Sequence, residues 1–359
     1  MTNRNLQEKL TSLKIPKGIP RILTQDDAVK QNIEYIRKRA SGELITLSTC
    51  YNRLNNAVGG FEPNTILTLS GLSGGGKSTL SKRVVNSMIK DLQSKCKDCL
   101  SLSFNFEMLA QKTIGREVSY LSKMPLKKLY SSESPLASAM MERMFKQYHK
   151  NLMDYPIIYV EEPQNYNTIG NTIYYFWKSL CRDSGSYMIV EIDHAVITKG
   201  LTGDTQKTKV DNLMEILNAI KKKIAFEGGN VFYIVLSQMN RDIKHKDRIM
   251  VPEMHYPLTS DLFAASSIEF FSDYIMITHM PSKLNLKYYT DNKFPIWLGN
   301  KEKEFIYWHL LKNRDGKPDQ IIPMLNNLHH FNFKEVELDD FKTYCEEFIR
   351  TGKCTVKKK

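Results

Sequence analysis

The stretch "TILTLSGLSGGGKSTLSKRVV" at residues 65–85 contains the pattern that decides the fold. From Gly71 it reads G-x-x-x-x-G-K-[ST], the glycine-rich loop that cradles nucleotide phosphates. Its glycines permit a close backbone approach, so that successive N–H groups face the phosphate oxygens. Lys77 supplies a positive charge, and Ser78 supplies a hydroxyl for Mg²⁺. A glycine-rich turn without a ligand is the alternative interpretation.

The flanking residues favour a nucleotide site. An apolar run at residues 64–71 predicts a buried strand, and the spacing of apolar residues over 77–93 predicts a helix. A strand, a glycine loop and a helix in this order direct the helix N-terminus at an anion. We therefore expect ATP and Mg²⁺ as cofactors. The expected cofactor-binding residues are Gly71, Leu72, Ser73, Gly74, Gly75, Gly76, Lys77, Ser78 and Thr79.

Composition indicates a globular protein with a charged partner. The chain has 359 residues, of which 42% are hydrophobic, and this is sufficient for a large core. A formal charge of +12 favours a polyanionic partner, although it also suits solubility. No apolar run approaches the roughly 18 residues that cross a bilayer, and the N-terminus lacks the apolar core of a secretory signal. We expect a cytoplasmic protein, in the host cytoplasm if the chain is viral, with no membrane partner.

The six cysteines are mostly isolated, which is typical of a reducing compartment. Cys96 and Cys99 form a single CxxC pair. A zinc site needs two further ligands, and no second CxxC or HxxxH accompanies the pair. We expect a structural role for this pair; a redox or metal role is the alternative.

Apolar runs typical of strands alternate with helical patterns beyond the glycine loop. This alternation predicts an α/β fold with a mostly parallel central sheet and helices on both faces. The residues at 321–327 and 329–333 are expected to add an edge hairpin. Further strands are expected at residues 100–106, 157–162, 187–193, 231–238, 274–280 and 304–311, with helices near 107–123, 135–152, 167–183, 207–227 and 259–271.

Polar side chains follow several of the predicted strands. Ligands of open parallel sheets gather at the carboxyl ends of the strands. Glu107 is a candidate general base, Asp193 a candidate magnesium ligand and Gln238 a candidate sensor of the terminal phosphate. Each of them is alternatively a solvated strand end.

Lys312 and Arg314 lie two residues apart in "LLKNRDG" and share one face of an extended segment. Cations of this kind stabilise the charge that develops on a transferred phosphoryl group, and a second subunit often supplies them. Two ordinary basic residues on a surface strand are the alternative.

The order of these motifs resembles a known family. "GLSGGGKSTL", "FNFEM", "IVEIDHAVI", "VLSQMNRD", "DLFAASSIEFFSDYIMI" and "LLKNRDG" are similar, in sequence and order, to the motifs of the C-terminal motor of DnaB-type replicative helicases. The resemblance covers about residues 25–335.

The resemblance implies a RecA-like P-loop NTPase core and a superfamily 4 helicase that acts in DNA replication. It implies a ring, usually a hexamer, with ATP at the subunit interfaces and single-stranded DNA in the channel. In such a ring Lys77 and Ser78 would bind the phosphates and magnesium, and Asp193 would hold the metal. Glu107 would activate water and Gln238 would couple the terminal phosphate to movement. Lys312 and Arg314 match the pair that reaches into the neighbouring site.

The same resemblance divides the chain into an arm at 1–24, a linker helix at 25–42, a motor domain at 43–335, and a C-terminal helix with a basic tail at 336–359. The linker helix would dock on an adjacent subunit, or alternatively pack on its own core. Only about 24 residues precede it, so we expect a homologue of phage type without the family's N-terminal collar domain. A primase or a helicase loader is an expected partner. The C-terminal helix either docks such a partner or covers its own core.

One departure concerns the grip on DNA. Phe263 stands where relatives place an arginine that touches DNA phosphate. The replacement candidates for DNA binding are Lys199, Lys207, Lys209, Arg241 and Lys244, with Lys246 and Arg248 beside them. Solvated surface loops are the alternative. Two rival functions remain open, namely a RecA-like or KaiC-like DNA-binding ATPase that does not unwind DNA, and a nucleotide-regulated partner or loader of a larger helicase.

Overall fold

The computed structural model describes residues 22–299 and 301–354, so most of the expected N-terminal arm lies outside the described residues. The chain divides into two compact units, Met1–Thr46 and Leu47–Lys359. The first unit contains helix α2 (Gln25–Ala40), at the position where the sequence predicts a helix.

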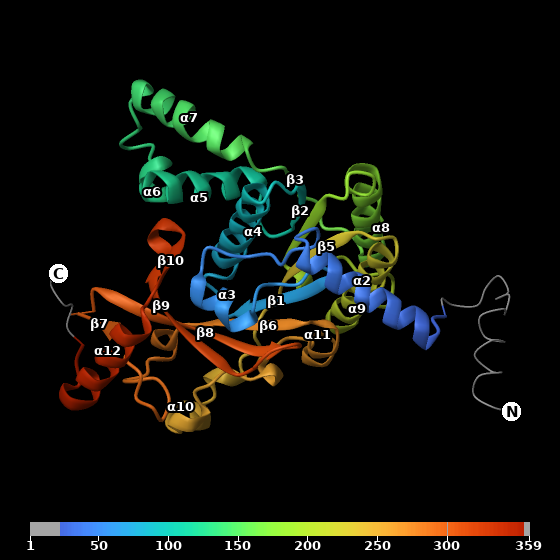
Figure 1. Cartoon of the computed structure of the whole chain (residues 1–359). Helices are drawn as coiled ribbons and strands as arrows, with labels where there is room; N and C mark the ends of the chain where they lie inside the picture. Colours follow the sequence, from blue (N-terminus) through green and yellow to red (C-terminus); the bar gives the residue numbers. More distant parts are fainter. Residues whose placement is uncertain (1–21, 300, 355–359) are drawn as a thin grey trace, which may run out of the picture. The chain divides into compact units, whose positions relative to one another are not determined.

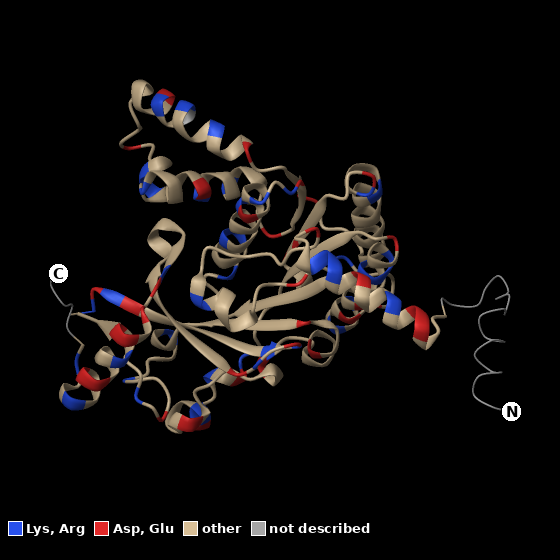
Figure 2. Cartoon of the chain, viewed as in Figure 1, with Lys and Arg blue, Asp and Glu red and all other residues tan. Residues whose placement is uncertain are grey.

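Helix α2 has strong signals at both of its ends. The Thr24 hydroxyl accepts a hydrogen bond from the backbone N–H of Asp27, and the Asp27 carboxylate accepts one from the backbone N–H of Thr24. Acidic residues occupy the first turn and basic residues the last turn, which complements the helix dipole (Figure 2). None of its residues is buried, and Val29, Ile33 and Ile36 are 46%, 44% and 57% exposed. The helix therefore carries an apolar stripe that remains open to solvent.

The second unit begins with helix α3 (Asn52–Val58) and is built on one sheet of ten described strands (Figure 1). The strand order is β10-β9-β8-β6-β1-β5-β4-β2-β3, and β7 pairs with β8. Six strands are parallel: β1 (Thr65–Gly71), β2 (Cys99–Asn105), β3 (Ile157–Val160), β4 (Tyr187–Asp193), β5 (Asn230–Leu236) and β6 (Tyr274–His279). Four strands extend the sheet in antiparallel pairing: β7 (Trp297–Leu298), β8 (Lys303–Asn313), β9 (Gln320–Asn327) and β10 (Asn332–Glu335).

Helices cover both faces of the parallel strands. Successive side chains of a strand point to opposite faces. On β4, Val190 and Ile192 join the core cluster that contains α8 (Tyr166–Phe176) and α9 (Gln206–Phe226), whereas Glu191 between them contacts α4 (Lys77–Ser94) on the other face. The predicted α/β class, with a mostly parallel sheet between helices, is confirmed.

The remaining helices lie outside this sandwich or at its ends. They are α5 (Ala110–Ser122), α6 (Leu126–Leu129), α7 (Ser138–Met153), α10 (Lys246–Met250), α11 (Ala265–Phe271) and α12 (Leu338–Thr351), and a π-helical turn at Trp177–Cys181 extends α8. The single helix expected at 259–271 is wrong in part. A short turn at Thr259–Asp261 precedes α11, because Ala264 takes a positive φ of 56° that interrupts the helix.

The antiparallel edge forms a smaller core of its own. The predicted hairpin is confirmed as β9 and β10. Aromatic side chains of β8 pack against α12, where the ring centres of Phe305 and Phe341 are 5.9 Å apart. Tyr344 and Phe348 of α12 pack against the same cluster. The C-terminal helix therefore covers its own core.

Residues 22–299 and 301–354 contain neither a membrane-spanning helix nor a cluster of metal ligands. No helix in these ranges is both long and apolar enough to span a bilayer. They also hold no group of three or more His, Cys, Asp or Glu side chains arranged to bind a metal ion. Cys96 is exposed, Cys99 is half-buried, and both are free thiols.

Candidate nucleotide site

The glycine-rich loop connects β1 to α4. Gly74 and Gly76 have φ values of +67° and +87°, in the left-handed region that favours glycine. The Lys77 ammonium donates to the carbonyl oxygen of Gly71 at 2.9 Å. Helix α4 begins at Lys77, so its N-terminal N–H groups border the loop. These N–H groups and the Lys77 charge suit a bound polyphosphate.

A cavity of about 480 Å³ opens beside the loop. Its wall contains Asp193, the last residue of β4, and Glu107 and Gln238, which follow β2 and β5. Strands β2 and β5 end two residues before Glu107 and Gln238, so both residues sit on the loops just beyond the sheet. The complete lining is Ser73, Gly74, Gly76, Lys77, Ser78, Thr79, Glu107, Met108, Arg116, Asp193, His194, Gln238, Leu328 and Phe331. The structure thus brings the three predicted strand-end residues to the glycine loop.

Asp193 and Ser78 supply oxygen atoms at one point of this wall. Burial, together with the charge of the nearby Glu191, raises the pKa of Asp193 to about 6, although a hydrogen bond with Ser78 opposes the shift. A carboxylate and a hydroxyl are hard oxygen donors of the kind that Mg²⁺ binds. The donor set fits a magnesium ion, and a cation there would favour the ionised form of Asp193.

Glu107 projects from the loop after β2, and its side chain is 59% exposed. The nearest Glu107 oxygen is 3.7 Å from Nε2 of His194, which burial keeps at a lowered pKa. His194 also lines the cavity, and sequence reasoning did not assign it a role. Its position directly after Asp193, at the end of an apolar strand, was the signal available in the sequence.

Arg116, Leu328 and Phe331 form a wall that the sequence did not indicate. The Arg116 guanidinium of α5 lies 5.4 Å from the ring centre of Phe331, in the turn between β9 and β10. A Cβ atom on Gly76 would lie 2.9 Å from Leu328 and 2.7 Å from Phe333. The C-terminal hairpin therefore reaches the glycine loop. No spacing pattern links these residues, so only the fold reveals their proximity.

Buried ion pairs connect the elements that carry the cavity residues. The Lys82 ammonium is 3.0 Å from Glu191, and Ser81 and Ser103 donate to the same carboxylate. Burial alone would raise the pKa of Glu191, but Lys82 and these hydroxyls hold it below its usual value. Glu191 lies two residues before Asp193, and Lys82 lies four residues after Ser78. The ion pair thus fixes α4 to β4, and with them the positions of Ser78 and Asp193.

A second buried pair connects α4 to α5. The Arg83 guanidinium binds the Glu117 carboxylate, which also accepts a hydrogen bond from Asn86 at 2.8 Å. Both charged side chains are at most 7% exposed. Breaking a buried pair leaves an uncompensated charge, so these residues fix the position of α5 beside the cavity.

Lys312 and Arg314 lie apart from the cavity of their own chain. Lys312 is near the end of β8 and donates to the backbone carbonyl of Glu269. Arg314 follows the strand, and its Nε atom is 2.7 Å from the Asp273 carboxylate. The Arg314 side chain remains 51% exposed. Neither residue appears in the cavity wall described above.

The DNA-binding candidates divide into exposed and structural residues. Arg248 differs from the expectation that it is free to bind DNA. Its guanidinium binds the buried Asp261 carboxylate and donates to the carbonyls of Met254 and Tyr256. It holds a loop together and is not a free cation for DNA. The exposed candidates are Lys199, Lys207, Arg241, Lys244 and Lys246; Lys209 is half-buried. Phe263 is half-buried against the main core.

The sequence profile of the family described as "DnaB-like helicase C terminal domain" matches residues 46–334. The chain belongs to this family. No curated protein matches it.

Two solved structures share the RecA-like fold of this family member. One, titled as an "ATPase Domain", is 18% identical, with a TM-score of 0.67 over 88% of this chain and 100% of that one. A structure of a DnaB-like replicative helicase, titled for its interactions with primase, is 16% identical, with a TM-score of 0.65 over 93% of this chain and 71% of that one. At these identities the likeness establishes the fold.

Proposed function

We propose that this chain is the ATP-driven motor of a replicative DNA helicase of superfamily 4, which translocates on single-stranded DNA as a hexameric ring in the cytoplasm. The observation that carries the proposal is the meeting of Glu107, Asp193 and Gln238 with the glycine loop in one cavity of about 480 Å³. Family membership supports the helicase class.

Each residue of the cavity has a proposed role in hydrolysis. Lys77 and the loop N–H groups bind the phosphates of ATP, while Ser78 and Asp193 hold Mg²⁺. The magnesium ion would neutralise phosphate charge when bound. Glu107 accepts a proton from the attacking water, and its exposure leaves room for that water beside it. Gln238 hydrogen-bonds the terminal phosphate, so the position of the loop after β5 depends on whether that phosphate is present.

Lys312 and Arg314 are proposed to act on the nucleotide of an adjacent copy. They lie outside the cavity of their own chain, and Arg314 keeps half of its surface exposed. A guanidinium supplied across an interface can stabilise the charge that develops on the phosphoryl group. This arrangement would make hydrolysis depend on assembly.

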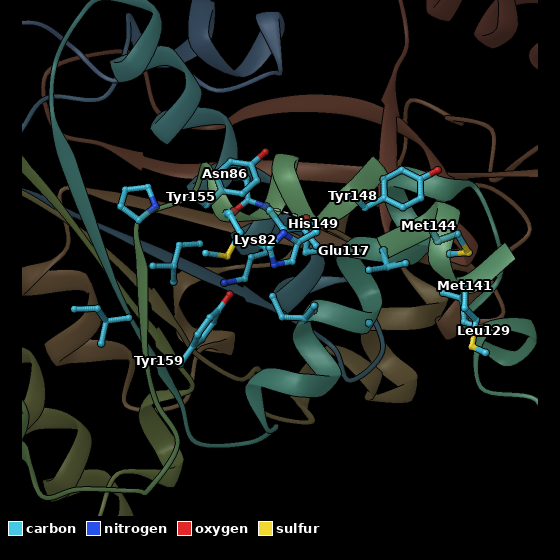
Figure 3. Close-up of a pocket in the computed structure, with 18 of the residues that line it drawn as sticks. Lys82, Asn86, Glu117, Leu129, Met141, Met144, Tyr148, His149, Tyr155 and Tyr159 are labelled. Carbon is cyan, nitrogen blue, oxygen red and sulfur yellow. Dashed lines mark hydrogen bonds between the residues drawn. The ribbon is translucent and has the colours of Figure 1, made fainter. Parts of the chain in front are cut away.

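An apolar groove supports assembly of the ring. A hollow of about 670 Å³ lies among β3, α5, α6 and α7, and we call it the apolar groove (Figure 3). Leu129, Met141, Met144 and Tyr148 line it, with Lys82 and Glu117 at its inner wall. An uncovered apolar surface of this size commonly marks an interaction site.

We propose that helix α2 of a second copy occupies the apolar groove. Val29, Ile33 and Ile36 form an exposed stripe of the kind that an apolar groove accommodates. Since Lys82 and Glu117 also take part in the ion pairs below the nucleotide cavity, a helix in the groove would contact the support of that cavity.

Contacts with single-stranded DNA are proposed for Lys199, Lys207, Lys209, Arg241 and Lys244. They lie beyond β4 and β5, the strands that lead to Asp193 and Gln238. Each phosphate contact with a single strand makes the affinity fall by roughly 0.7 log units for every tenfold rise in salt concentration. Oligonucleotide binding without a salt slope would remove this set. A primase or a helicase loader is the proposed protein partner.

The deciding experiment measures ATPase activity with and without single-stranded DNA, together with the mass of the protein in nucleotide. We expect DNA-stimulated turnover by an oligomer. A protein that stays monomeric with both ligands present would overturn the proposal. A strand-displacement assay then separates a helicase from a RecA-like or KaiC-like ATPase, and low DNA-stimulated turnover with tight protein binding would indicate a loader.

A further inference from the structure

A second lysine contacts the glycine loop from the turn that follows β6. This turn, Pro281–Leu284, places Lys283 at the surface between buried Pro281 and buried Leu284. The Ser282 hydroxyl donates to Glu304 of β8, and Glu304 also accepts a hydrogen bond from Asn326 of β9 at 2.6 Å. The turn is therefore fixed on both sides of Lys283.

Strand β6 brings this turn against the loop. In the parallel pairing of β1 and β6, Thr278 lies opposite Gly71, and the Thr278 hydroxyl donates to the carbonyl of Gly75 at 2.8 Å. A Cβ atom on Gly71 would lie 2.5 Å from the Thr278 carbonyl oxygen. The end of β6 and the loop are thus in direct contact and hold a fixed relative position.

The Lys283 ammonium reaches the tip of the loop. It donates a hydrogen bond to the carbonyl oxygen of Ser73. A Cβ atom on Gly74 would lie only 2.7 Å from the same nitrogen. Ser73 and Gly74 both line the nucleotide cavity, so a cation stands at the rim where the loop begins.

Two ammonium groups therefore serve one short loop. Lys77 donates to the Gly71 carbonyl, and Lys283 donates to the Ser73 carbonyl two residues further on. Burial lowers the pKa of Lys77, the nearby Asp193 and Glu107 raise it, and the like charge of Lys283 lowers it. Two ammonium groups at one short loop repel each other. An anion between them would relieve this repulsion, and more negative charge would relieve it more.

We propose that Lys283 is a specificity-determining cation that favours a nucleoside triphosphate over a diphosphate at this site. When a triphosphate binds, the ammonium exchanges the Ser73 carbonyl for an oxygen of the terminal phosphate. A hydrogen bond between two ionised groups is stronger than one to a neutral carbonyl. A diphosphate presents no oxygen at that place, so the lysine keeps its bond to the loop. This inference rests on the proposed function, because it assigns a residue to the same nucleotide site.

The test compares the full-length chain with Lys283→Ala, Lys283→Arg and the matched control Lys287→Ala. Lys287 is an exposed lysine four residues further along, so its replacement removes the same charge from the same segment of the chain. Dissociation constants are measured for ADP and for the non-hydrolysable analogue β,γ-imido-ATP, each with Mg²⁺. We expect Lys283→Ala to lose about fivefold or more in affinity for the triphosphate, and less than twofold for ADP. Lys283→Arg should recover most of the loss, and Lys287→Ala should match the wild type.

Each contrary outcome has a distinct meaning. Equal losses for both nucleotides in Lys283→Ala would show that the lysine only fixes the loop, and unchanged dissociation constants for both nucleotides would show that it does not contact the phosphates. Either result overturns this inference and leaves the motor proposal intact. A wild-type chain that binds neither nucleotide would overturn the motor proposal and this inference together.

Discussion

The nucleotide cavity and the apolar groove are two hollows of one compact unit, built by opposite means. The cavity is lined chiefly by the glycine loop and by residues at or just beyond the ends of three strands, so directional polar groups surround about 480 Å³. The groove of about 670 Å³ is lined chiefly by carbon atoms of β3, α5, α6 and α7. A polar hollow selects a small ligand through a few fixed atoms, whereas an apolar one selects a partner through area and shape. Changes in the cavity should therefore alter chemistry, and changes at the groove should alter assembly.

Removing the charge at the centre of the cavity should have the largest effect. In Lys77→Ala the loop keeps its glycines but loses the ammonium that faces the phosphates. We expect ATP turnover to fall below detection and the affinity for nucleotide to fall with it. Steady-state phosphate release and a nucleotide titration measure both quantities. Normal turnover in this variant would show that the chemistry takes place elsewhere.

Loss of the cation proposed to act across an interface should rank next. Arg314→Ala should reduce turnover by about a thousandfold, in line with arginine residues supplied by a partner. Asp273 keeps its 3.0 Å contact with Lys221, so the fold should survive. Mixing with Lys77→Ala subunits should restore part of the activity, because each variant supplies what the other lacks.

Lys317→Ala is the control for that experiment, since it removes an exposed cation from the same loop. If mixed assemblies gain nothing, Arg314 acts within its own chain.

Replacing the proposed general base should reduce turnover by a smaller factor and leave nucleotide binding intact. Glu107→Gln keeps the shape of the side chain and removes its ability to accept a proton. Turnover should fall about a hundredfold to a thousandfold, while nucleotide affinity stays within about twofold. Glu162→Gln makes the same change at an exposed site outside the cavity and should behave as the wild type. Retained turnover in Glu107→Gln would end its assignment as the base.

A charge on helix α2 should leave the chemistry of the cavity intact and weaken assembly. Burial of an isoleucine side chain contributes about 1.5–3 kcal/mol. Ile33→Asp should therefore lower the mass measured by light scattering, without changing nucleotide affinity by more than about twofold. Gln31→Asp places the same charge on the opposite face of the helix and should assemble normally. An Ile33→Asp protein of unchanged mass would show that the apolar groove holds something else.

The sequence predicted the parallel strands of the sheet and the polar residues at their carboxyl ends for the same reason. A loop of fixed spacing marks the end of β1, and apolar runs mark β2, β4 and β5, so Glu107, Asp193 and Gln238 could be placed at one edge. These features are local in sequence and repeat with a known period. The break before α11 was missed, because a positive φ at Ala264 has no signature in an alanine.

Long-range contacts explain the remaining errors. Arg248 looked like a free cation because its partner Asp261 lies thirteen residues away, across a turn. Arg116 and Phe331 come from different ends of the chain and meet only after folding. The apolar groove was not predicted for the same reason, since the sequence indicated only separate helices near 107–123 and 135–152, and the short helix α6 between them was not predicted.

The β9–β10 hairpin approaches Gly76, so the nucleotide cavity is complete only when this hairpin has folded against the glycine loop. Leu328 and Phe331 close a wall of the hollow, and they lie far beyond the glycine loop in the sequence, so a ribosome synthesises them much later. A nascent chain that has not yet reached the β9–β10 hairpin therefore lacks one wall of the nucleotide cavity. Nucleotide that binds the finished pocket contributes its binding free energy to the packing of the β9–β10 hairpin against the glycine loop, so the ligand also stabilises a contact between distant parts of the sequence.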